Sequence, residues 1–389
     1  MPKVIISDSL SKSAREIFLS KGIDVEEKVN LSEEELIKEI KLYDALVVRS
    51  NTKVNKQVLN AGENLKVVGR AGIGVDNIDV KFASEKGIIV MNTPFGNSIT
   101  TAEHAIALMF SLARNIPQAN KSTHSGKWEK NRFMGSELYG KTLGLIGCGR
   151  IGSIVANRAI GLKLKVVAFD PFLSEESAKE IGVGKVDFDY LLNNSDFISL
   201  HTPLTDTTRN IINKESLKKM KEGVCIINCA RGGLIDEREL LEHLNQGKIS
   251  GVALDVFTKE PAYENVLFGH DKVIVTPHLG ASTLEAQENV SIQVAEQISD
   301  FLLKGAVENA LNMPSISGED APKIQPFLEL VKQIGSLLGQ LIDFEVKKFV
   351  IEFNGKVASL NIRPLTSVAL EGVFKYGIDS INMVNAPII

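Results

Sequence analysis

Apolar and polar positions follow two repeating patterns along this chain. Short apolar runs such as 3–7, 45–48 and 88–91 are rich in Val, Ile and Leu and are bounded by polar or glycine residues, which predicts buried strands. Between them, stretches such as 11–20 and 32–41 carry apolar residues at helical spacing. The regular alternation predicts a doubly wound parallel sheet of the flavodoxin type, with helices on both faces.

The same alternation resumes in the second part of the chain, where a glycine-rich turn opens it. The apolar run 143–146 leads into Gly147-Cys148-Gly149-Arg150-Ile151-Gly152, and a helical pattern follows. Strand, GxGxxG and helix in this order are the fingerprint of a Rossmann dinucleotide site. The glycines permit a tight turn, close approach of a pyrophosphate and close packing of helix on strand, and the helix N-terminus holds the phosphates. The alternative is an ordinary strand–turn–helix connection.

Asp170 distinguishes between the two nicotinamide dinucleotides. It directly follows the next predicted strand, 165–169. A carboxylate at this place accepts hydrogen bonds from the adenosine ribose and repels a 2′-phosphate, so the sequence predicts NAD as the cofactor. The alternative is a turn residue in front of Pro171.

Two helix-start patterns suggest where the chain passes between domains. Thr100-x-x-Glu103 and Ser282-x-x-Glu285 each have the form of a capping box in front of a long helical pattern. We therefore expect two domains, one of which is discontinuous. The predicted ranges are 1–95 with 283–312 for a substrate-binding domain and 96–282 for an inserted NAD domain.

The last part of the chain differs from the rest. A stretch rich in Pro, Ser, Gly and Asp, 309–323, is typical of a linker. It leads to 320–389, which we interpret as a partial third unit of α+β type. Its predicted elements are an amphipathic helix at 327–341 and a hairpin at 347–358 around Asn354-Gly355.

Candidate catalytic residues follow the predicted strands of the NAD domain. Oxidation of a hydroxyl carbon needs a base for the proton and a cation for the substrate acid. His278 and His201 both end strands, and we favour His278 because it leads into the domain crossing. Glu260 is a candidate partner of that histidine, or else a capping carboxylate. Arg231, which precedes two glycines, is a candidate for the cation that binds the substrate acid, or else a member of a structural ion pair.

The strand ends of the first domain carry a different set of residues. Arg49 to Thr52, Arg70 to Gly74 and Asn92 to Pro94 offer a guanidinium, amides, hydroxyls and open backbone, which suit a small anionic substrate. The Gly72-x-Gly74 pair lacks the third glycine, so we interpret it as an anion-binding backbone loop. For any one of these residues, an ordinary loop role is the alternative.

Composition narrows the class of protein. The chain has 389 residues, 44 basic and 48 acidic, a net charge of −4, 44% hydrophobic residues and three cysteines, and its mean hydropathy is +0.04. This balance favours neither nucleic acid nor membrane as a partner. The cysteines are too few for a disulfide framework and lack the histidines of a zinc site, so we expect a cytoplasmic enzyme without a metal. The first residues enter a strand at once, and no signal peptide is expected.

The motifs together resemble a known family. They are GRAGIGVDNID (69–79), NTPFGNS (92–98), TAEHAIAL (101–108), FMGSELYGKTLGLIGCGRIG (133–152), VVAFDPF (166–172), HTPLT (201–205), NCARGGLIDE (228–237), ALDVF (253–257), KEP (259–261) and TPHLGAST (276–283). In order and spacing this set is similar to that of the D-isomer-specific 2-hydroxyacid dehydrogenases. The similarity covers about residues 1–312.

The resemblance implies a role for each matching residue. The implied catalytic trio is Arg231, Glu260 and His278. The implied cofactor contacts are Gly147, Gly149, Arg150, Ile151, Gly152, Asp170, Thr202, Cys229, Ala230, Arg231, Asp255, His278, Leu279, Gly280 and Ala281. The implied substrate contacts are Arg49, Gly74, Asn97, Arg231 and His278.

The resemblance also implies a reaction and an assembly. Residues 320–389 are similar to the start of the intervening domain in the long members that act on 3-phosphoglycerate, where an effector-binding domain follows. We therefore expect NAD-dependent oxidation of D-3-phosphoglycerate to 3-phosphohydroxypyruvate, the first step of L-serine biosynthesis. The alternatives are another D-2-hydroxyacid, such as glycerate or lactate, and an NAD-sensing corepressor-like protein. Members of the family form homodimers or homotetramers, often through a segment corresponding to 114–140.

Overall fold

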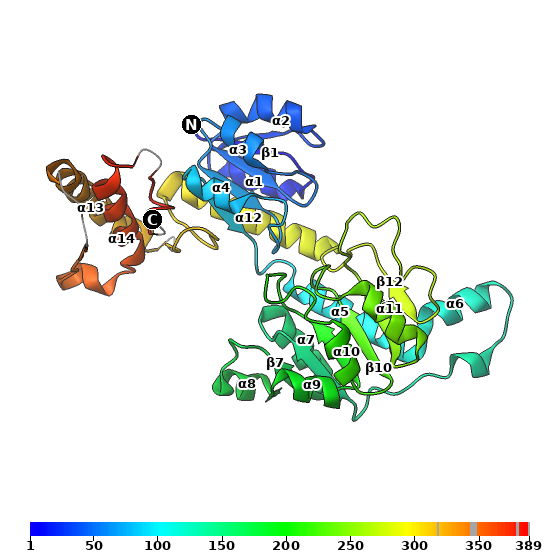
Figure 1. Cartoon of the computed structure of the whole chain (residues 1–389). Helices are drawn as coiled ribbons and strands as arrows, with labels where there is room; N and C mark the ends of the chain where they lie inside the picture. The colour runs from blue at the N-terminus through cyan, green and yellow to red at the C-terminus, as the bar shows by residue number, and fades with distance from the viewer. Residues whose placement is uncertain (317–318, 343–347, 379–380, 388–389) are drawn as a thin grey trace. The chain divides into compact units, whose positions relative to one another are not determined.

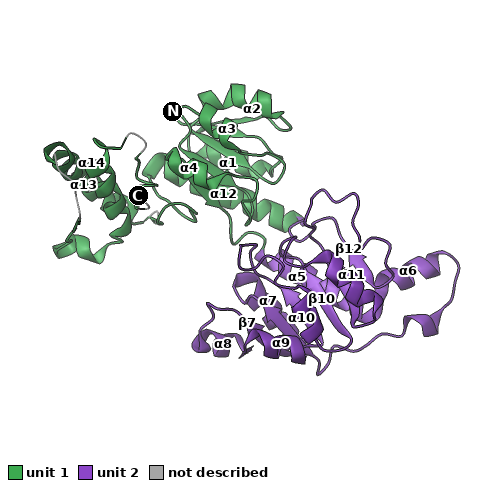
Figure 2. Cartoon of the chain, in the orientation of Figure 1, with its two compact units in different colours: residues 1–97, 284–389 green, residues 98–283 purple. Residues whose placement is uncertain are grey.

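The computed structural model divides into two compact units, which Figure 2 shows in different colours. The structure describes residues 1–316, 319–342, 348–378 and 381–387. Unit 1 consists of Met1–Asn97 and Leu284–Ile389, and unit 2 of Ser98–Thr283.

Unit 1 is built on a parallel sheet with helices on both faces, as the sequence pattern predicted. Its strand order is β2-β1-β3-β4-β5. The strands are β1 (Lys3–Ile6), β2 (Asp24–Glu27), β3 (Ala45–Val48), β4 (Val67–Arg70) and β5 (Ile89–Asn92). The helices between them are α1 (Lys12–Ser20), α2 (Glu33–Glu39), α3 (Lys56–Ala61) and α4 (Val80–Glu85), with a 3-10 turn, η1 (Ile40–Leu42). Val4 and Ile6 face one hydrophobic cluster and Ile5 the other, because successive side chains of a strand point to opposite faces.

Helix α12 (Leu284–Lys304) brings a distant part of the sequence onto this sheet (Figure 1). It packs against α1 and β4. A Cβ placed on Gly69 in β4 would lie 2.5 Å from Ile298 Cδ1 and 2.8 Å from Val294 Cγ2. Glycine at position 69 therefore lets the helix approach the strand closely, and the core of unit 1 contains side chains from both ends of the sequence.

Unit 2 contains a larger parallel sheet of order β12-β11-β10-β9-β6-β7-β8. The strands are β6 (Thr142–Ile146), β7 (Lys165–Phe169), β8 (Gly184–Lys185), β9 (Phe197–Leu200), β10 (Val224–Asn228), β11 (Ile249–Leu254) and β12 (Val273–Val275). The helices are α5 (Ser98–Arg114), α6 (Ile116–His124), α7 (Arg150–Gly161), α8 (Glu175–Ile181), α9 (Phe188–Asn194), α10 (Lys214–Lys219) and α11 (Glu237–Asn245), with a 3-10 turn, η2 (Lys130–Phe133). The chain order reverses between β6 and β9, and ligands of such sheets bind at this switch point.

One predicted helix start differs in detail from the structure. Helix α5 begins at Ser98, so Thr100 lies inside the helix and does not cap it. Thr100 Oγ1 instead lies 3.4 Å from Thr283 Oγ1. The prediction of a capping box at Thr100 was wrong because the spacing of Thr and Glu also fits two residues within a first turn.

The C-terminal segment is helical in the part of it that the structure describes. Helices α13 (Ala321–Leu341) and α14 (Arg363–Phe374) pack closely, since a Cβ on Gly335 would lie 2.5 Å from the Ala369 carbonyl oxygen. The predicted hairpin was wrong for its described residues. Residues 348–354 form no strand, and Gly355–Ser359 is a 3-10 turn, η3. Gly355 has the positive φ of 78° that Asn-Gly turns favour, but strands need a pairing partner as well as a turn.

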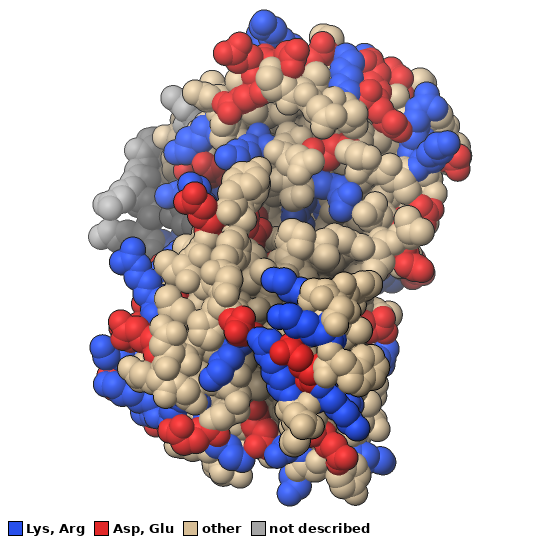
Figure 3. Space-filling model, turned by 90° about the vertical axis from the view of Figure 1, so that its right-hand side faces the viewer, with Lys and Arg blue, Asp and Glu red and all other residues tan. Residues whose placement is uncertain are grey.

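The surface carries charges of both signs. Figure 3 shows basic side chains gathered over the lower part of the face in view, with acidic side chains among them. Among the described residues, none of the helices combines the length and the apolar composition that crossing a bilayer requires.

Candidate active site

The glycine-rich turn lies between β6 and α7 at the switch point of the unit 2 sheet. Gly147 has a φ of 92°, and a Cβ on it would lie 2.5 Å from the His201 carbonyl oxygen, so only glycine fits. A Cβ on Gly152 would collide with the Gly147 carbonyl oxygen. In contrast, a Cβ on Gly149 meets no atom within 4 Å. The first and third glycines therefore serve the fold, while Gly149 leaves open space at the N-terminus of α7, which suits a pyrophosphate.

Asp170 lies beside this turn. Its Oδ2 accepts a hydrogen bond from the Cys148 N–H at 2.8 Å, and its Oδ1 accepts one from the Phe172 N–H at 2.8 Å. These bonds fix the carboxylate at the end of β7. Each carboxylate oxygen has two lone pairs, so further donors such as ribose hydroxyls can bind it.

His278 and Glu260 form a short hydrogen-bonded pair. His278 Nδ1 lies 2.6 Å from Glu260 Oε2. A carboxylate only accepts, so Nδ1 carries the proton and Nε2 is the basic nitrogen. Glu260 Oε1 accepts a second bond from the Phe257 N–H at 2.9 Å, which fixes the carboxylate. The His278 side chain is 50% exposed and hence accessible to a substrate.

The pair perturbs the acidity of both members. The hydrogen bond to Glu260 raises the pKa of His278, although burial and the charge of Arg231 act in the opposite direction. Burial alone raises the pKa of Glu260, but the bonds from His278 and the Phe257 N–H outweigh it and leave this pKa below its usual value. A histidine held by a carboxylate in this way is a typical acid–base catalyst.

Arg231 follows β10 and contributes the positive charge that acts on His278. Its Nη1 donates to the Ala230 carbonyl oxygen at 2.6 Å, and its own carbonyl oxygen accepts from Asn228 Nδ2 at 2.9 Å. A Cβ on the adjacent Gly232 would collide with the Phe257 carbonyl oxygen. Glycine at 232 therefore lets the Arg231 turn lie directly against the loop that carries Glu260.

Asp255, an implied cofactor contact, lies inside the fold of unit 2. Its side chain is fully buried, at 0% exposed. Its Oδ1 accepts from Thr276 Oγ1 at 2.6 Å and from the Leu279 N–H at 2.7 Å, while Oδ2 accepts from the Gly280 N–H at 2.8 Å. In this arrangement the carboxylate holds the segment around His278 from inside the fold. A strand-end position could not reveal this, because it does not tell which way the side chain points.

The other predicted cofactor residues occupy the same edge of the unit 2 sheet. Arg150 and Ile151 start α7, Thr202 follows β9, Cys229 and Ala230 follow β10, and Leu279 to Ala281 follow β12. His201, the alternative catalytic histidine, is different in character. Its Nε2 lies 2.8 Å from Ser199 Oγ, and burial lowers its pKa to about 4, so it stays neutral. It lacks a carboxylate partner of the kind that Glu260 gives His278 in the described contacts.

The predicted substrate residues belong to unit 1. Arg49 directly follows β3, and its backbone is fixed on both sides: its N–H donates to Asp8 Oδ2 at 2.6 Å and its carbonyl oxygen accepts from Asn77 Nδ2 at 2.7 Å. Gly74 lies in the loop after β4, and the buried Asn97 lies after β5. All three therefore lie beyond the carboxyl ends of unit 1 strands.

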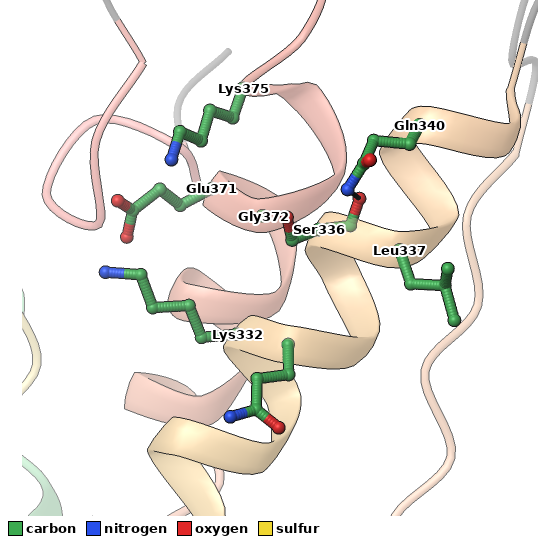
Figure 4. Close-up of a pocket in the computed structure, with 8 residues that line it drawn as sticks. Lys332, Ser336, Leu337, Gln340, Glu371, Gly372 and Lys375 are labelled. Carbon is green, nitrogen blue, oxygen red and sulfur yellow. Dashed lines mark hydrogen bonds between the residues drawn. The ribbon is translucent and has the colours of Figure 1, made fainter.

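A groove in the C-terminal segment has no comparable chemistry. It lies between α13 and α14 and measures about 340 Å³. Figure 4 shows the amino groups of Lys332 and Lys375 on either side of the Glu371 carboxylate, with Ser336 and Gln340 on the neighbouring helix. No group of three or more His, Cys, Asp or Glu side chains suited to a metal ion occurs within the described residues.

Two residues near His278 were not predicted as functional. Thr101 and His104 come from the first turns of α5, and both bond to the segment 276–280. Their sequence signal was the TAEHAIAL motif, but a histidine inside a helix gives no indication of its neighbour across the fold.

Two parts of the chain match models of known protein families. Residues 106–280 match the model of the D-isomer specific 2-hydroxyacid dehydrogenase, NAD binding domain. Residues 323–389 match the D-3-phosphoglycerate dehydrogenase intervening domain.

Individual relatives extend the similarity over nearly the whole chain. D-3-phosphoglycerate dehydrogenase from Archaeoglobus fulgidus is 46% identical over 386 residues, which are 99% of this chain and 73% of the relative. The enzyme of the same name from Bacillus subtilis is 46% identical over 388 residues, with the same shares of 99% and 73%. Among solved structures, D-lactate dehydrogenase from Aquifex aeolicus in complex with NAD and lactic acid has a TM-score of 0.70 at 27% identity. That match covers 80% of this chain and 100% of the other.

Proposed function

Because the chain belongs to the D-isomer-specific 2-hydroxyacid dehydrogenases, we propose that it oxidises D-3-phosphoglycerate to 3-phosphohydroxypyruvate with NAD, the first step of L-serine biosynthesis. The identity to relatives of that name supports the choice of substrate. The observation that carries the chemistry is the 2.6 Å bond between His278 and Glu260 on the sheet edge that also holds the glycine-rich turn.

His278 is the proposed acid–base catalyst. Its Nδ1–H is held by Glu260, so Nε2 accepts the proton of the substrate hydroxyl. Glu260 stabilises the imidazolium that forms, as the raised pKa of His278 indicates. When bound, NAD accepts the hydride from the substrate carbon. In the reverse direction, protonated His278 donates its proton to the oxygen of the keto acid.

Arg231 is the proposed binding group for the substrate carboxylate and the reacting oxygen. A guanidinium binds a carboxylate through two parallel hydrogen bonds, which fixes the orientation of the substrate. Its charge also opposes protonation of His278, which keeps the pKa of this base from rising further. Arg49, Gly74 and Asn97 of unit 1 are the proposed contacts for the rest of the substrate, including its phosphate.

The residues proposed to hold NAD are those of the unit 2 sheet edge. Gly149, Arg150 and Ile151 bind the pyrophosphate, and Asp170 binds the ribose. Thr202, Cys229, Ala230, and Leu279 to Ala281 line the remainder. The open space at Gly149 and the fixed carboxylate of Asp170 support this assignment.

We propose a division of labour between three parts of the chain. Residues 1–95 with 283–312 bind the substrate, 96–282 bind NAD, and 320–389 form part of an intervening, regulatory-type domain. The compact units change at Asn97 and Leu284, and the intervening-domain match starts at residue 323, which support these boundaries.

We also propose that the enzyme is a cytoplasmic homodimer or homotetramer. The segment 114–140 of unit 2 exposes large apolar side chains, with Trp128 at 88%, Met134 at 79% and Tyr139 at 73%. Large apolar side chains exposed along one segment favour a protein partner, and a second copy is the partner we propose. All three cysteines are free thiols, which suits a reducing compartment. Sedimentation of the Trp128→Glu, Met134→Glu double variant should give a smaller particle than wild type, and an unchanged mass would contradict this interface.

The test of the function is a panel of 2-hydroxy and 2-keto acids with and without a phosphate, followed by NADH formation or consumption. We expect the highest kcat/KM with 3-phosphoglycerate and its keto acid. A higher value with glycerate or lactate would assign another substrate within the family. NAD-dependent association without turnover of any acid would instead assign an NAD-sensing protein.

A further inference from the structure

The first turns of α5 hold the segment that carries His278. Thr101 and His104 are three residues apart, so they lie on the same side of the helix. Thr101 Oγ1 donates to the Gly280 carbonyl oxygen at 2.9 Å. His104 Nε2 lies 3.2 Å from Thr276 Oγ1 and 3.3 Å from Asp255 Oδ1. One helix face therefore bonds to both ends of residues 276–280.

Asp255 transmits the position of His104 to this segment. Its carboxylate accepts hydrogen bonds from Thr276 Oγ1, the Leu279 N–H and the Gly280 N–H. Its backbone carbonyl oxygen accepts one from the His278 N–H at 2.9 Å. His278 itself has a left-handed φ of 55°, which costs a non-glycine residue free energy and persists only where neighbouring bonds enforce it. The carboxylate of Asp255 supplies those bonds on the C-terminal side of His278.

The carboxylate in turn depends on His104. Burial raises the pKa of Asp255, and the hydrogen bonds from His104, Thr276 and the Leu279 N–H bring it below its ordinary value. The carboxylate accepts only, so His104 Nε2 carries a proton in this contact. The His104 side chain is 19% exposed, and its ring therefore lies mostly inside the fold, against the carboxylate.

We propose that His104 is a positioning residue for the reaction: it donates to Asp255, which holds residues 276–280 so that His278 meets Glu260. This inference rests on the proposed function for its kinetic consequences, but the geometry of the pair can be measured without turnover.

The groups that set the protonation of His278 come from the loops that follow two neighbouring strands. Asp255 and Glu260 follow β11, and Arg231 follows β10. Glu260 and Asp255 raise the pKa of His278, and Arg231 lowers it. If the donor at 104 is lost, the segment moves and Asp255 gains a proton more easily. Both changes weaken the hold of the two carboxylates on His278, so its pKa falls toward 6.5.

The matched variants are His104→Ala, which removes the donor, and His104→Gln, whose amide nitrogen can replace Nε2–H. His243→Ala serves as the control, because His243 is also a buried helix histidine and its Nδ1 lies 2.8 Å from the Glu239 carbonyl oxygen, within its own helix. Each full-length variant is assayed for kcat, for the KM toward the phosphorylated acid, for NAD binding by fluorescence, and for the His278 pKa by NMR titration of the ring carbons, assigned with His278→Ala.

His104→Ala is expected to lower kcat about 30-fold with KM and NAD binding within about threefold, since only the base is displaced. It should also lower the pKa of His278, and His104→Gln should restore both values. His243→Ala should lower thermal stability without moving either one. Loss of stability alone in His104→Ala, or equal impairment of the Ala and Gln variants, would overturn the proposal. If wild type turns over none of the acids, the proposed function fails, and the NMR titration still decides whether His104 positions His278.

Discussion

Both sheets of this protein are parallel with helices on their faces, and each carries a glycine loop after one strand. The two loops differ in the space around their glycines. Unit 1 has Gly72-x-Gly74 after β4, and unit 2 has the Gly147 turn after β6. In unit 1 the flexible guanidinium of Arg70 lies where a Cβ on Gly72 would be. In unit 2 the space at Gly149 is open, and a 12-residue helix begins at the next residue.

The difference shows what makes a glycine loop a nucleotide site. Glycines alone give a flexible turn, and both loops have them. The unit 2 loop adds a helix N-terminus aimed at open space, whereas in unit 1 the next helix, α4, starts only at Val80. The same contrast holds for the charged residues of the two edges. Unit 2 pairs a histidine with a carboxylate, and unit 1 presents Arg49 on an anchored backbone.

The largest expected effect tests the assignment of the chemistry to unit 2. His278→Ala removes the proposed base, and kcat should fall about a thousandfold, within the range for loss of general acid–base catalysis. NAD binding, followed by quenching of protein fluorescence or by calorimetry, should stay within about threefold of wild type. Turnover close to that of wild type would exclude His278 as the base and would contradict the assignment of the chemistry to unit 2.

The second prediction tests the open space at Gly149. Gly149→Val places a branched side chain where the pyrophosphate is proposed to lie, and its φ of −71° is negative, as in most non-glycine residues. The Kd for NAD should rise about 100-fold. Gly161→Val at the other end of α7 is the matched control, because a Cβ there also meets no atom within 4 Å. If both variants bind NAD as wild type does, the space at Gly149 holds no phosphate.

The strands of both sheets could largely be predicted from the sequence, because strands buried on both faces appear as continuous apolar runs. The runs at 45–48 and 165–169 coincide with β3 and β7. Strand β8 has only two residues and no apolar run, so it was missed. The contact of His104 with Asp255 joins residues far apart in the sequence, and a periodic pattern carries no information about such pairs. For the same reason the sequence does not tell how Asp255 and Glu260 lie: both follow β11, but the Asp255 side chain is fully buried and that of Glu260 is 33% exposed.

The third prediction concerns the binding role of unit 1. Arg49→Gln keeps a long polar side chain and removes the positive charge. The KM for 3-phosphoglycerate should rise about 30-fold with kcat within a few fold of wild type, because the charge is proposed to bind the ground state and the transition state alike. Steady-state kinetics with the phosphorylated and the unphosphorylated acid separates the two roles. A loss confined to kcat would mean that unit 1 takes part in the chemistry and does not only bind the substrate.

The smallest expected effect tests how Glu260 sets the pKa of His278 in unit 2. Glu260→Gln keeps a partner for His278 Nδ1 but removes the negative charge that raises the pKa of His278. Oxidation needs the neutral imidazole, so in wild type kcat/KM falls as the pH drops through this raised pKa. In the variant the pKa lies nearer 6.5, and the acidic limb of the profile should move to lower pH. Reduction needs the protonated form, so its alkaline limb should also move to lower pH.

At the pH optimum, kcat of the Gln variant should fall about tenfold, because a neutral amide stabilises the imidazolium less than a carboxylate does. Glu264→Gln, a change of the same kind in the same loop region, should leave both limbs in place. Limbs that stay in place in Glu260→Gln would mean that the charge of Glu260 does not set the pKa of His278, and an alkaline shift would contradict the raising effect of that charge. The pKa of His278 would then be set by the fold of unit 2 as a whole, and the contact between His278 and Glu260 would be a consequence of that fold.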